Sequence, residues 1–238
     1  MGFNKNSSFN EPIFQASSVE VKKLIIIAFE GAETEHKYFS YLKTHPEINL
    51  KSLVQIELLE RDEKNKNSSA PTKVVETVTN VIESEEKLNE IKSKHDEFDD
   101  SYDVFWIVID REKQESKKIN LLKAIEICKE NNIKISLINP AFEFWLLLHF
   151  DISEYDNNDL FENKKTKPKS KKRFLEKEVG KKIGSYDKSD FETSFITSES
   201  VTLAVKQEEK FENELEKIID NLGSNVGNLI KEILDIHI

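Results

Sequence analysis

Four short strand-like segments, of which the first and third are continuous apolar runs, alternate with segments of helical periodicity, and this pattern constrains the fold of this chain more than any other feature. The first run is rich in isoleucine and ends at Phe29, and the third extends from Val104 to Ile109. Continuous apolar runs of this length are typical of strands buried on both faces of a sheet. Because these strands alternate with helices, the pattern predicts a mainly parallel, four-stranded α/β sheet with helices on both faces. The predicted strands are residues 22–29, 54–58, 104–109 and 133–138.

The predicted helices connect these strands and continue beyond them. They cover residues 33–43, 71–94, 121–128, 142–150, 200–222 and 226–234. We expect three regions: a flexible leader over residues 1–20, an α/β core over residues 21–150, and a basic segment with a C-terminal helical lobe over residues 151–238.

Composition favours a cytoplasmic globular protein with no membrane partner. Apolar residues make up 37% of the 238 residues and charged residues 34%, and no segment approaches the ~20 apolar residues of a membrane helix. The N-terminus is polar and lacks the apolar stretch of a secretory signal. The single cysteine, Cys128, cannot form an internal disulfide and fits a helix core.

The charge is distributed unevenly along the chain. The net charge is −10, yet between Lys164 and Lys182 ten Lys or Arg oppose two Glu, which leaves −18 on the rest of the chain. Such a basic segment could follow the phosphates of nucleic acid, DNA or RNA; the alternative is a solvated loop and helix face. The candidate nucleic-acid contacts are Lys164, Lys165, Lys167, Lys169, Lys171, Lys172 and Arg173, with Tyr186 and Lys188 as further candidates for positioning a phosphate.

Acidic residues follow two of the predicted strands. Glu30 follows the first strand, with Glu33 and Glu35 one helical turn further on, and Asp110 and Glu112 follow the third strand. Open parallel sheets bind ligands outside the carboxyl ends of their strands, and hard divalent cations prefer oxygen ligands. We therefore expect these acids to hold one or two Mg²⁺ or Mn²⁺ ions suited to phosphodiester cleavage. Glu143, which follows the fourth strand, is a further candidate ligand.

Several of these acids could have a structural role instead of a cation-binding role, because carboxylates stabilise helix N-termini. That effect alone could account for Glu33, Glu35, Glu112 and Glu143. The motifs that define other nucleotide-binding and metal-binding sites are absent from the sequence. The chain has no G-x-x-x-x-G-K-[ST] sequence, no G-x-G-x-x-G after a strand, and no Cys/His grouping with zinc spacing.

Three motifs resemble the RloB-like family. The first extends from Phe29 to Phe39 and includes Glu30-Gly31, and the second ends in Asp110-Arg111-Glu112. The third and most specific extends from Asn139 to Phe150, as Asn-Pro-Ala-Phe-Glu-Phe-Trp-Leu-Leu-Leu-His-Phe. The resemblance covers residues 22–234.

This resemblance implies a Toprim-like fold, as in topoisomerases, primases and OLD-type nucleases. The Toprim pattern has a Glu after the first strand and Asp-x-Asp after the third. Glu30 matches the pattern, whereas Asp110-x-Glu112 departs from it by one methylene. The resemblance implies Glu30 as general acid/base or ligand and Asp110 and Glu112 as metal ligands. It further implies a nuclease in antiphage defence with a partner ATPase, since RloB-like proteins are associated with restriction and abortive-infection loci.

Two other functions stay open. A non-catalytic module that binds nucleic acid or docks the ATPase is favoured by the Glu112 departure and by the lack of an obvious catalytic base. A receiver-like signalling domain with Asp110 as phosphoacceptor would explain the strand-end acids but not the third motif. DNA, RNA and free nucleotides are all candidate substrates, and the oligomeric state is open.

Overall fold

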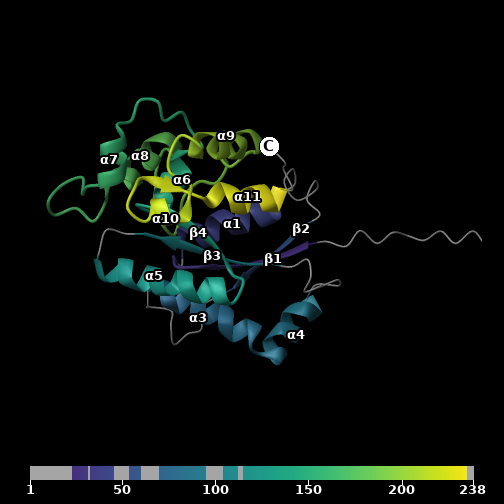
Figure 1. Cartoon of the computed structure of the whole chain (residues 1–238). Helices are drawn as coiled ribbons and strands as arrows, with labels where there is room; N and C mark the ends of the chain where they lie inside the picture. The colour runs from purple at the N-terminus through teal and green to yellow at the C-terminus, as the bar shows by residue number, and fades with distance from the viewer. Residues whose placement is uncertain are drawn as a thin grey trace, which may run out of the picture.

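The computed structural model describes residues 23–31, 33–45, 54–59, 70–94, 104–111 and 115–234. This part of the chain has a mixed α/β architecture, with a sheet between two layers of helices (Figure 1). The mainly parallel sheet with helices on both faces is thereby confirmed. The expected leader lies outside the described residues, and the division after residue 150 stays a prediction. None of the described helices has the length and apolarity needed to cross a bilayer.

Four strands of the sheet lie where the sequence predicted them. They are β1 (Lys23–Phe29), β2 (Val54–Leu59), β3 (Val104–Asp110) and β4 (Lys134–Asn139), which pair in parallel in the order β2-β1-β3-β4. Every side chain from Leu24 to Phe29 is buried, as expected for a strand covered on both faces. Because all four strands are parallel, their carboxyl ends meet at one edge of the sheet.

A fifth strand corrects the predicted four-stranded sheet. Within the described residues, β5 (Gly223–Ser224) adds to β4 in antiparallel orientation. Asn225 extends this contact, because its side chain accepts from Leu137 N at 2.6 Å and donates to Ile135 O at 3.1 Å. The sequence indicated only a helix break at Gly223, since two residues carry no strand alternation.

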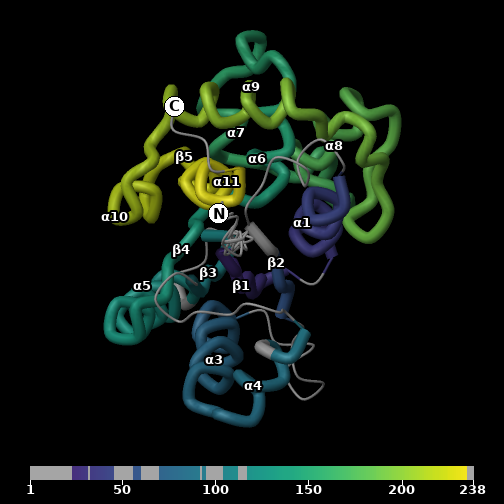
Figure 2. Tube along the Cα trace, turned by 90° about the vertical axis from the view of Figure 1, so that its right-hand side faces the viewer, coloured from purple at the N-terminus to yellow at the C-terminus, as the bar shows by residue number. Residues whose placement is uncertain are grey.

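One face of the sheet carries the larger layer of helices. Its members are α1 (Thr34–Thr44), α6 (Phe142–Leu147), α8 (Phe174–Ile183), α9 (Ser198–Glu208) and α11 (Val226–Leu234). Figures 1 and 2 both show these helices on the same side of the sheet. Their buried side chains form one cluster with those of β1 and β3. The helices expected as a C-terminal lobe therefore share a core with α1 and the sheet.

The opposite face is covered by α3 (Pro71–Ile82), α4 (Glu85–Lys94) and α5 (Glu115–Glu130). The prediction of one helix over residues 71–94 is wrong. It breaks at Glu83-Ser84, and the Ser84 hydroxyl accepts from Lys87 N at 3.3 Å, which supports a new helix start. The helix expected over residues 200–222 likewise separates into α9 and α10 (Leu215–Ile218). Neither α7 (Asn157–Glu162) nor α8 has a counterpart among the predicted helix ranges.

Candidate active site

Buried carboxylates gather at the carboxyl edge of the parallel strands. Glu30 directly follows β1, and its amide donates to Val108 O of β3 at 2.9 Å. Asp110 is the last residue of β3, and Glu143 lies in the first turn of α6, which follows β4. Glu30 and Glu143 are both buried. The structure thus brings together three acids that the sequence placed after three different strands.

The charges of the neighbouring acids act on the carboxyl group of Asp110. Burial raises the pKa of Asp110 well above its usual range, and the charges of Glu35, Glu143 and Glu30 raise it further, in that order. The Lys188 ammonium acts in the opposite direction. Within the described part of the chain, Asp110 Oδ1 accepts no hydrogen bond. This edge of the sheet therefore favours added positive charge.

Glu35 belongs to this cluster; the sequence offered it, beside Glu30, either as a cation-binding acid or as a helix N-terminal acid. It is buried in the first turn of α1, and among the neighbouring charges it has the largest effect on Asp110. A β-carbon at Gly31 would collide with the Glu35 carboxylate, so this side chain lies against the Gly31 backbone. A signal was present in the sequence, because Glu35 shares a helical face with Tyr38 and Phe39, both fully buried.

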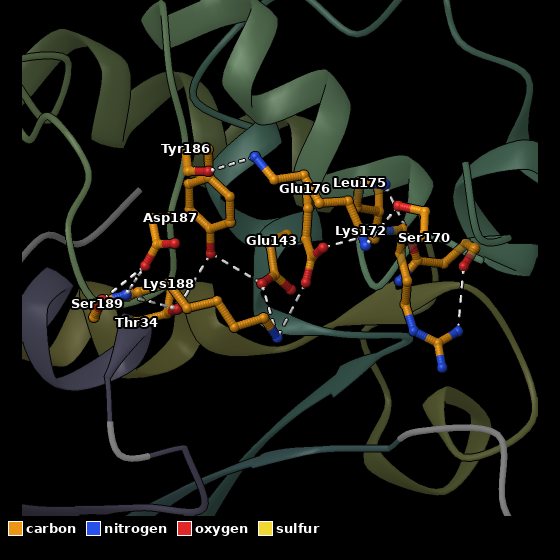
Figure 3. A network of polar contacts seen from close by, with 12 residues as sticks. Thr34, Glu143, Ser170, Lys172, Leu175, Glu176, Tyr186, Asp187, Lys188 and Ser189 are labelled. Atoms are coloured by element: carbon orange, nitrogen blue, oxygen red, sulfur yellow. Dashed lines mark hydrogen bonds and ion pairs between the residues drawn. The ribbon is translucent and has the colours of Figure 1, made fainter. Parts of the chain in front are cut away.

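Two lysines bring positive charge to the carboxylates. Lys117 of α5 places its Nζ 3.6 Å from Glu30 Oε1. Lys188 places its Nζ 3.2 Å from Glu143 Oε1 and 3.5 Å from Glu176 Oε1 (Figure 3). Burial acts against the charged form of Lys188, but the neighbouring carboxylates, led by Glu143, outweigh it and raise the lysine's pKa. Lys188 is therefore a cation throughout the neutral pH range.

Tyr186 holds Glu143 from a second direction. Its hydroxyl donates to Glu143 Oε1 at 2.9 Å and lies 3.1 Å from Thr34 Oγ1 (Figure 3). Thr34 also donates to the Lys188 carbonyl at 3.3 Å. Burial, followed by the charge of Glu143, raises the pKa of Tyr186, so its phenol stays protonated and able to donate. These bonds connect α1 and α6 to the segment that carries Lys188.

The expected metal ligands are not arranged as a finished metal centre. Glu112 lies outside the described residues. Within the described ranges, no three Asp, Glu, His or Cys side chains form a group that could hold a metal ion. The positive charge next to Glu30 comes from Lys117, and the positive charge next to Glu143 comes from Lys188.

Comparison with protein families identifies the chain. Residues 25–233, most of its length, match the family model described as RloB-like protein. The chain belongs to the RloB-like family. This confirms the resemblance seen in the three sequence motifs. The searches of curated proteins and of solved structures gave no significant match.

The three motifs of this RloB-like protein adjoin one another in the fold. They form the end of β1 with α1, the end of β3, and the end of β4 with α6. Two of their residues fasten the carboxyl edge to the C-terminal region. Asn139 Nδ2 donates to Ile218 O at 2.7 Å, and Arg111 Nε donates to Ile219 O at 2.8 Å. Asn139 and Arg111 thus position the chain at α10, which borders β4.

Other residues of the third motif are core. Trp145 is fully buried, as its place on an apolar helix predicts. His149 is also buried, with its Nε2 3.0 Å from the Tyr38 hydroxyl and its Nδ1 3.1 Å from Trp145 O. Burial lowers the pKa of His149 to about 4, so the ring is neutral at pH 7. His149 is a hydrogen-bonded core group, as expected from its position.

The basic segment of the RloB-like chain forms a loop and all of α8 except its last residue. Lys165 and Arg173 face each other across an antiparallel bridge that closes the loop. Lys172 Nζ donates to Tyr186 O at 3.1 Å, which joins the loop to the segment that carries Lys188. The candidate nucleic-acid contacts Lys164, Lys165, Lys167, Lys169, Lys171, Lys172 and Arg173 are all exposed. Their role in binding nucleic acid stays a prediction.

Proposed function

We propose that this RloB-like protein is a Toprim-type phosphoesterase that depends on Mg²⁺ or Mn²⁺ and acts as a nuclease. One observation carries the proposal: carboxylates converge at the carboxyl edge of a mainly parallel sheet. The convergence is expressed in the pKa of Asp110, which burial and then Glu35, Glu143 and Glu30 raise. Ligands of open parallel sheets bind at this edge.

The chemistry of the donor set suits a hard divalent cation. Asp110 and its acidic neighbours Glu30, Glu35 and Glu143 all offer carboxylate oxygens, which Mg²⁺ prefers. Asp110 Oδ1 accepts no hydrogen bond from a described residue. The described side chains form no three-membered metal group as they stand. We therefore assign the cation to Asp110, Glu112 and Glu30, with Glu143 as an additional ligand, and the described side chains of this set would turn toward it.

Each residue has a proposed role in phosphodiester hydrolysis. A bound cation would polarise the phosphate and lower the pKa of its bound water. Asp110 and Glu112 anchor the cation, and Glu30 is either a ligand or the group that takes a proton. Lys117, next to Glu30, places a compensating positive charge beside that carboxylate. The basic segment and Lys188 direct the phosphates toward the carboxylate edge.

The family supports a biological setting for this activity. RloB-like proteins are associated with restriction and abortive-infection loci, so we propose a role in antiphage defence with a partner ATPase in the cytoplasm. The charge distribution is consistent with a nucleic-acid substrate, because the acidic body would repel a polyanion everywhere except near the basic segment.

The test is a cleavage assay of the full chain on single-stranded DNA, double-stranded DNA and RNA, in Mg²⁺, Mn²⁺ or EDTA, with and without the ATPase. Asp110→Asn preserves the shape of the side chain and removes the carboxylate that would hold the cation, so we expect a loss of activity of at least about a hundredfold. Asp220→Asn is the matched control, since Asp220 pairs at the surface with Lys118. Cleavage that persists in Asp110→Asn would refute the assignment.

A second candidate is a non-catalytic module that binds nucleic acid or docks the ATPase. The observation in its favour is that Lys188 already compensates Glu143 and Glu176. This candidate predicts binding to nucleic acid or to the ATPase at equal affinity in Mg²⁺ and EDTA, with no product in any combination. Metal-dependent turnover would exclude it.

A further inference from the structure

Lys188 lies between two glutamates at the solvent side of the carboxylate cluster. Its Nζ is 3.2 Å from Glu143 Oε1 and 3.5 Å from Glu176 Oε1 (Figure 3). The Glu143 side chain is 3% exposed, whereas that of Lys188 is 52% exposed. The lysine therefore has water around it and room to move, while the carboxylate that it compensates is fixed in the interior.

The two glutamates are held in different ways. Glu143 Oε1 accepts from the Tyr186 hydroxyl at 2.9 Å in addition to its contact with Lys188. Glu176 lies in the first turn of α8, where its Oε2 accepts from Arg173 N at 2.9 Å and its Oε1 is turned to Lys188. The helix start thus fixes Glu176 whether or not Lys188 stays at Glu143.

We propose that Lys188 is a built-in counter-cation, which occupies Glu143 in the cation-free protein and moves to Glu176 when Mg²⁺ or Mn²⁺ binds. This inference rests on the proposed metal-dependent function. A buried carboxylate needs a compensating charge when no metal is present. A divalent cation and an ammonium repel each other at one carboxylate, so one must leave. Glu176 gives the departing ammonium a second acceptor at the same site.

The test measures Mn²⁺ affinity of the full chain without substrate, from the electron paramagnetic resonance signal of free Mn²⁺. Lys188→Met removes the competing ammonium and keeps a long side chain. We expect the Kd for Mn²⁺ to fall at least about fivefold, the effect of one unit charge at contact distance in a hydrated site.

Lys177→Met is the matched control for Lys188→Met. Lys177 is 53% exposed and its Nζ lies 3.6 Å from Glu178 Oε1, so the variant loses the same charge at the same exposure. We expect its Kd for Mn²⁺ to stay within about twofold of the wild-type value, because exposed charges outside the site are screened.

Glu176→Gln tests the second position of the ammonium. Without this acceptor Lys188 stays at Glu143, so Mn²⁺ should bind more weakly than to the wild type. In the Lys188→Met background the same change should have almost no effect, since no ammonium needs the position. Additive effects in the double variant would contradict the proposed exchange.

The outcomes separate this inference from the proposed function. Unchanged or weaker Mn²⁺ binding in Lys188→Met, or equal tightening in Lys177→Met, would overturn the counter-cation role and leave a metal-dependent enzyme standing. Absence of Mn²⁺ binding in both the wild type and Lys188→Met would refute the metal site itself. Binding that appears only in Lys188→Met would support the inference. Circular dichroism spectra verify that each variant is folded.

Discussion

At the scale of single residues, Glu208 is a buried acid with a structural role. It is the last residue of α9, and its carboxylate accepts from Gly227 N, at 3.1 Å to Oε1 and 3.0 Å to Oε2, in the first turn of α11. Burial raises the pKa of Glu208 to about 7, although hydrogen bonds from Ser224 and Gly227 oppose the shift. Glu208 thus connects α9 to α11, and its burial makes ionisation of its carboxyl group unfavourable.

This raised pKa predicts a pH-dependent stability. Between the ordinary pKa of 4.5 and the folded value of about 7, the folded state binds more protons than the unfolded state. The contribution of Glu208 is therefore fully present below pH 4.5 and is lost as the pH rises through 7, by about 3 kcal/mol. Glu208→Gln keeps an acceptor for Gly227 and should remove this part of the pH dependence.

Urea unfolding of both proteins at pH 5 and pH 8 measures the effect. We expect the wild type to lose more stability over this interval than Glu208→Gln does. Glu209→Gln is the control, because Glu209 is an exposed neighbour that pairs with Lys231. Parallel pH profiles for the wild type and Glu208→Gln would show that Glu208 ionises without cost.

Sequence alone found part of the site at this scale. Glu30, Asp110 and Glu143 were predictable because they follow strands, and parallel strands bring their ends together. Glu35 stayed open between a cation-binding acid and a helix N-terminal acid, because the helix dipole also explains an acid at that position. The contact of Lys188 with Glu176 joins positions twelve residues apart through the turn after α8, and no local spacing predicts such a turn.

At the scale of elements, β5 depends on the absence of a side chain at Gly223. A β-carbon there would collide with the backbone carbonyl of Glu212, which pairs with this segment: Ser224 N donates to Glu212 O at 2.9 Å. Gly223→Ala should therefore displace β5 and lower the free energy of unfolding by about 1–3 kcal/mol, the usual effect of overpacking.

Gly180→Ala provides the comparison for Gly223→Ala. Gly180 lies inside α8, where an added β-carbon would meet its nearest neighbour, the Tyr186 Cβ, at 3.4 Å. Alanine favours helix by up to about 1 kcal/mol relative to glycine, so this variant should be as stable as the wild type or more stable. Thermal unfolding of both variants decides the matter, and an unaffected Gly223→Ala would contradict the packing at β5.

The elements that the sequence predicted are those with many residues in one pattern. β1 and β3 have continuous apolar runs, β2 alternates apolar with polar residues, and α11 repeats its apolar residues at helical spacing. The interruptions were not predictable in the same way. Val81 and Ile91 continue one helical pattern across Glu83-Ser84, and both are buried, so periodicity alone does not reveal the break between α3 and α4.

At the scale of the whole molecule, Tyr186 connects the basic loop to the buried acidic cluster. The exposed basic loop connects through Lys172 to the backbone of Tyr186, whose hydroxyl binds Glu143. The acidic cluster, in turn, lies at the ends of β1 and β3 and in the first turns of α1 and α6. A polyanion held by the loop would thus have its phosphates next to the carboxylate edge, which the proposed nuclease requires.

The central claim is that a divalent cation binds at this edge. The most direct measurement is the anomalous difference density of a crystal of the protein soaked in Mn²⁺. We predict a peak within about 2.2 Å of an Asp110 oxygen, with Glu30 or Glu143 as a second ligand and the Lys188 ammonium turned toward Glu176. A peak elsewhere, or Lys188 still at Glu143 with no peak at saturating Mn²⁺, would contradict the account.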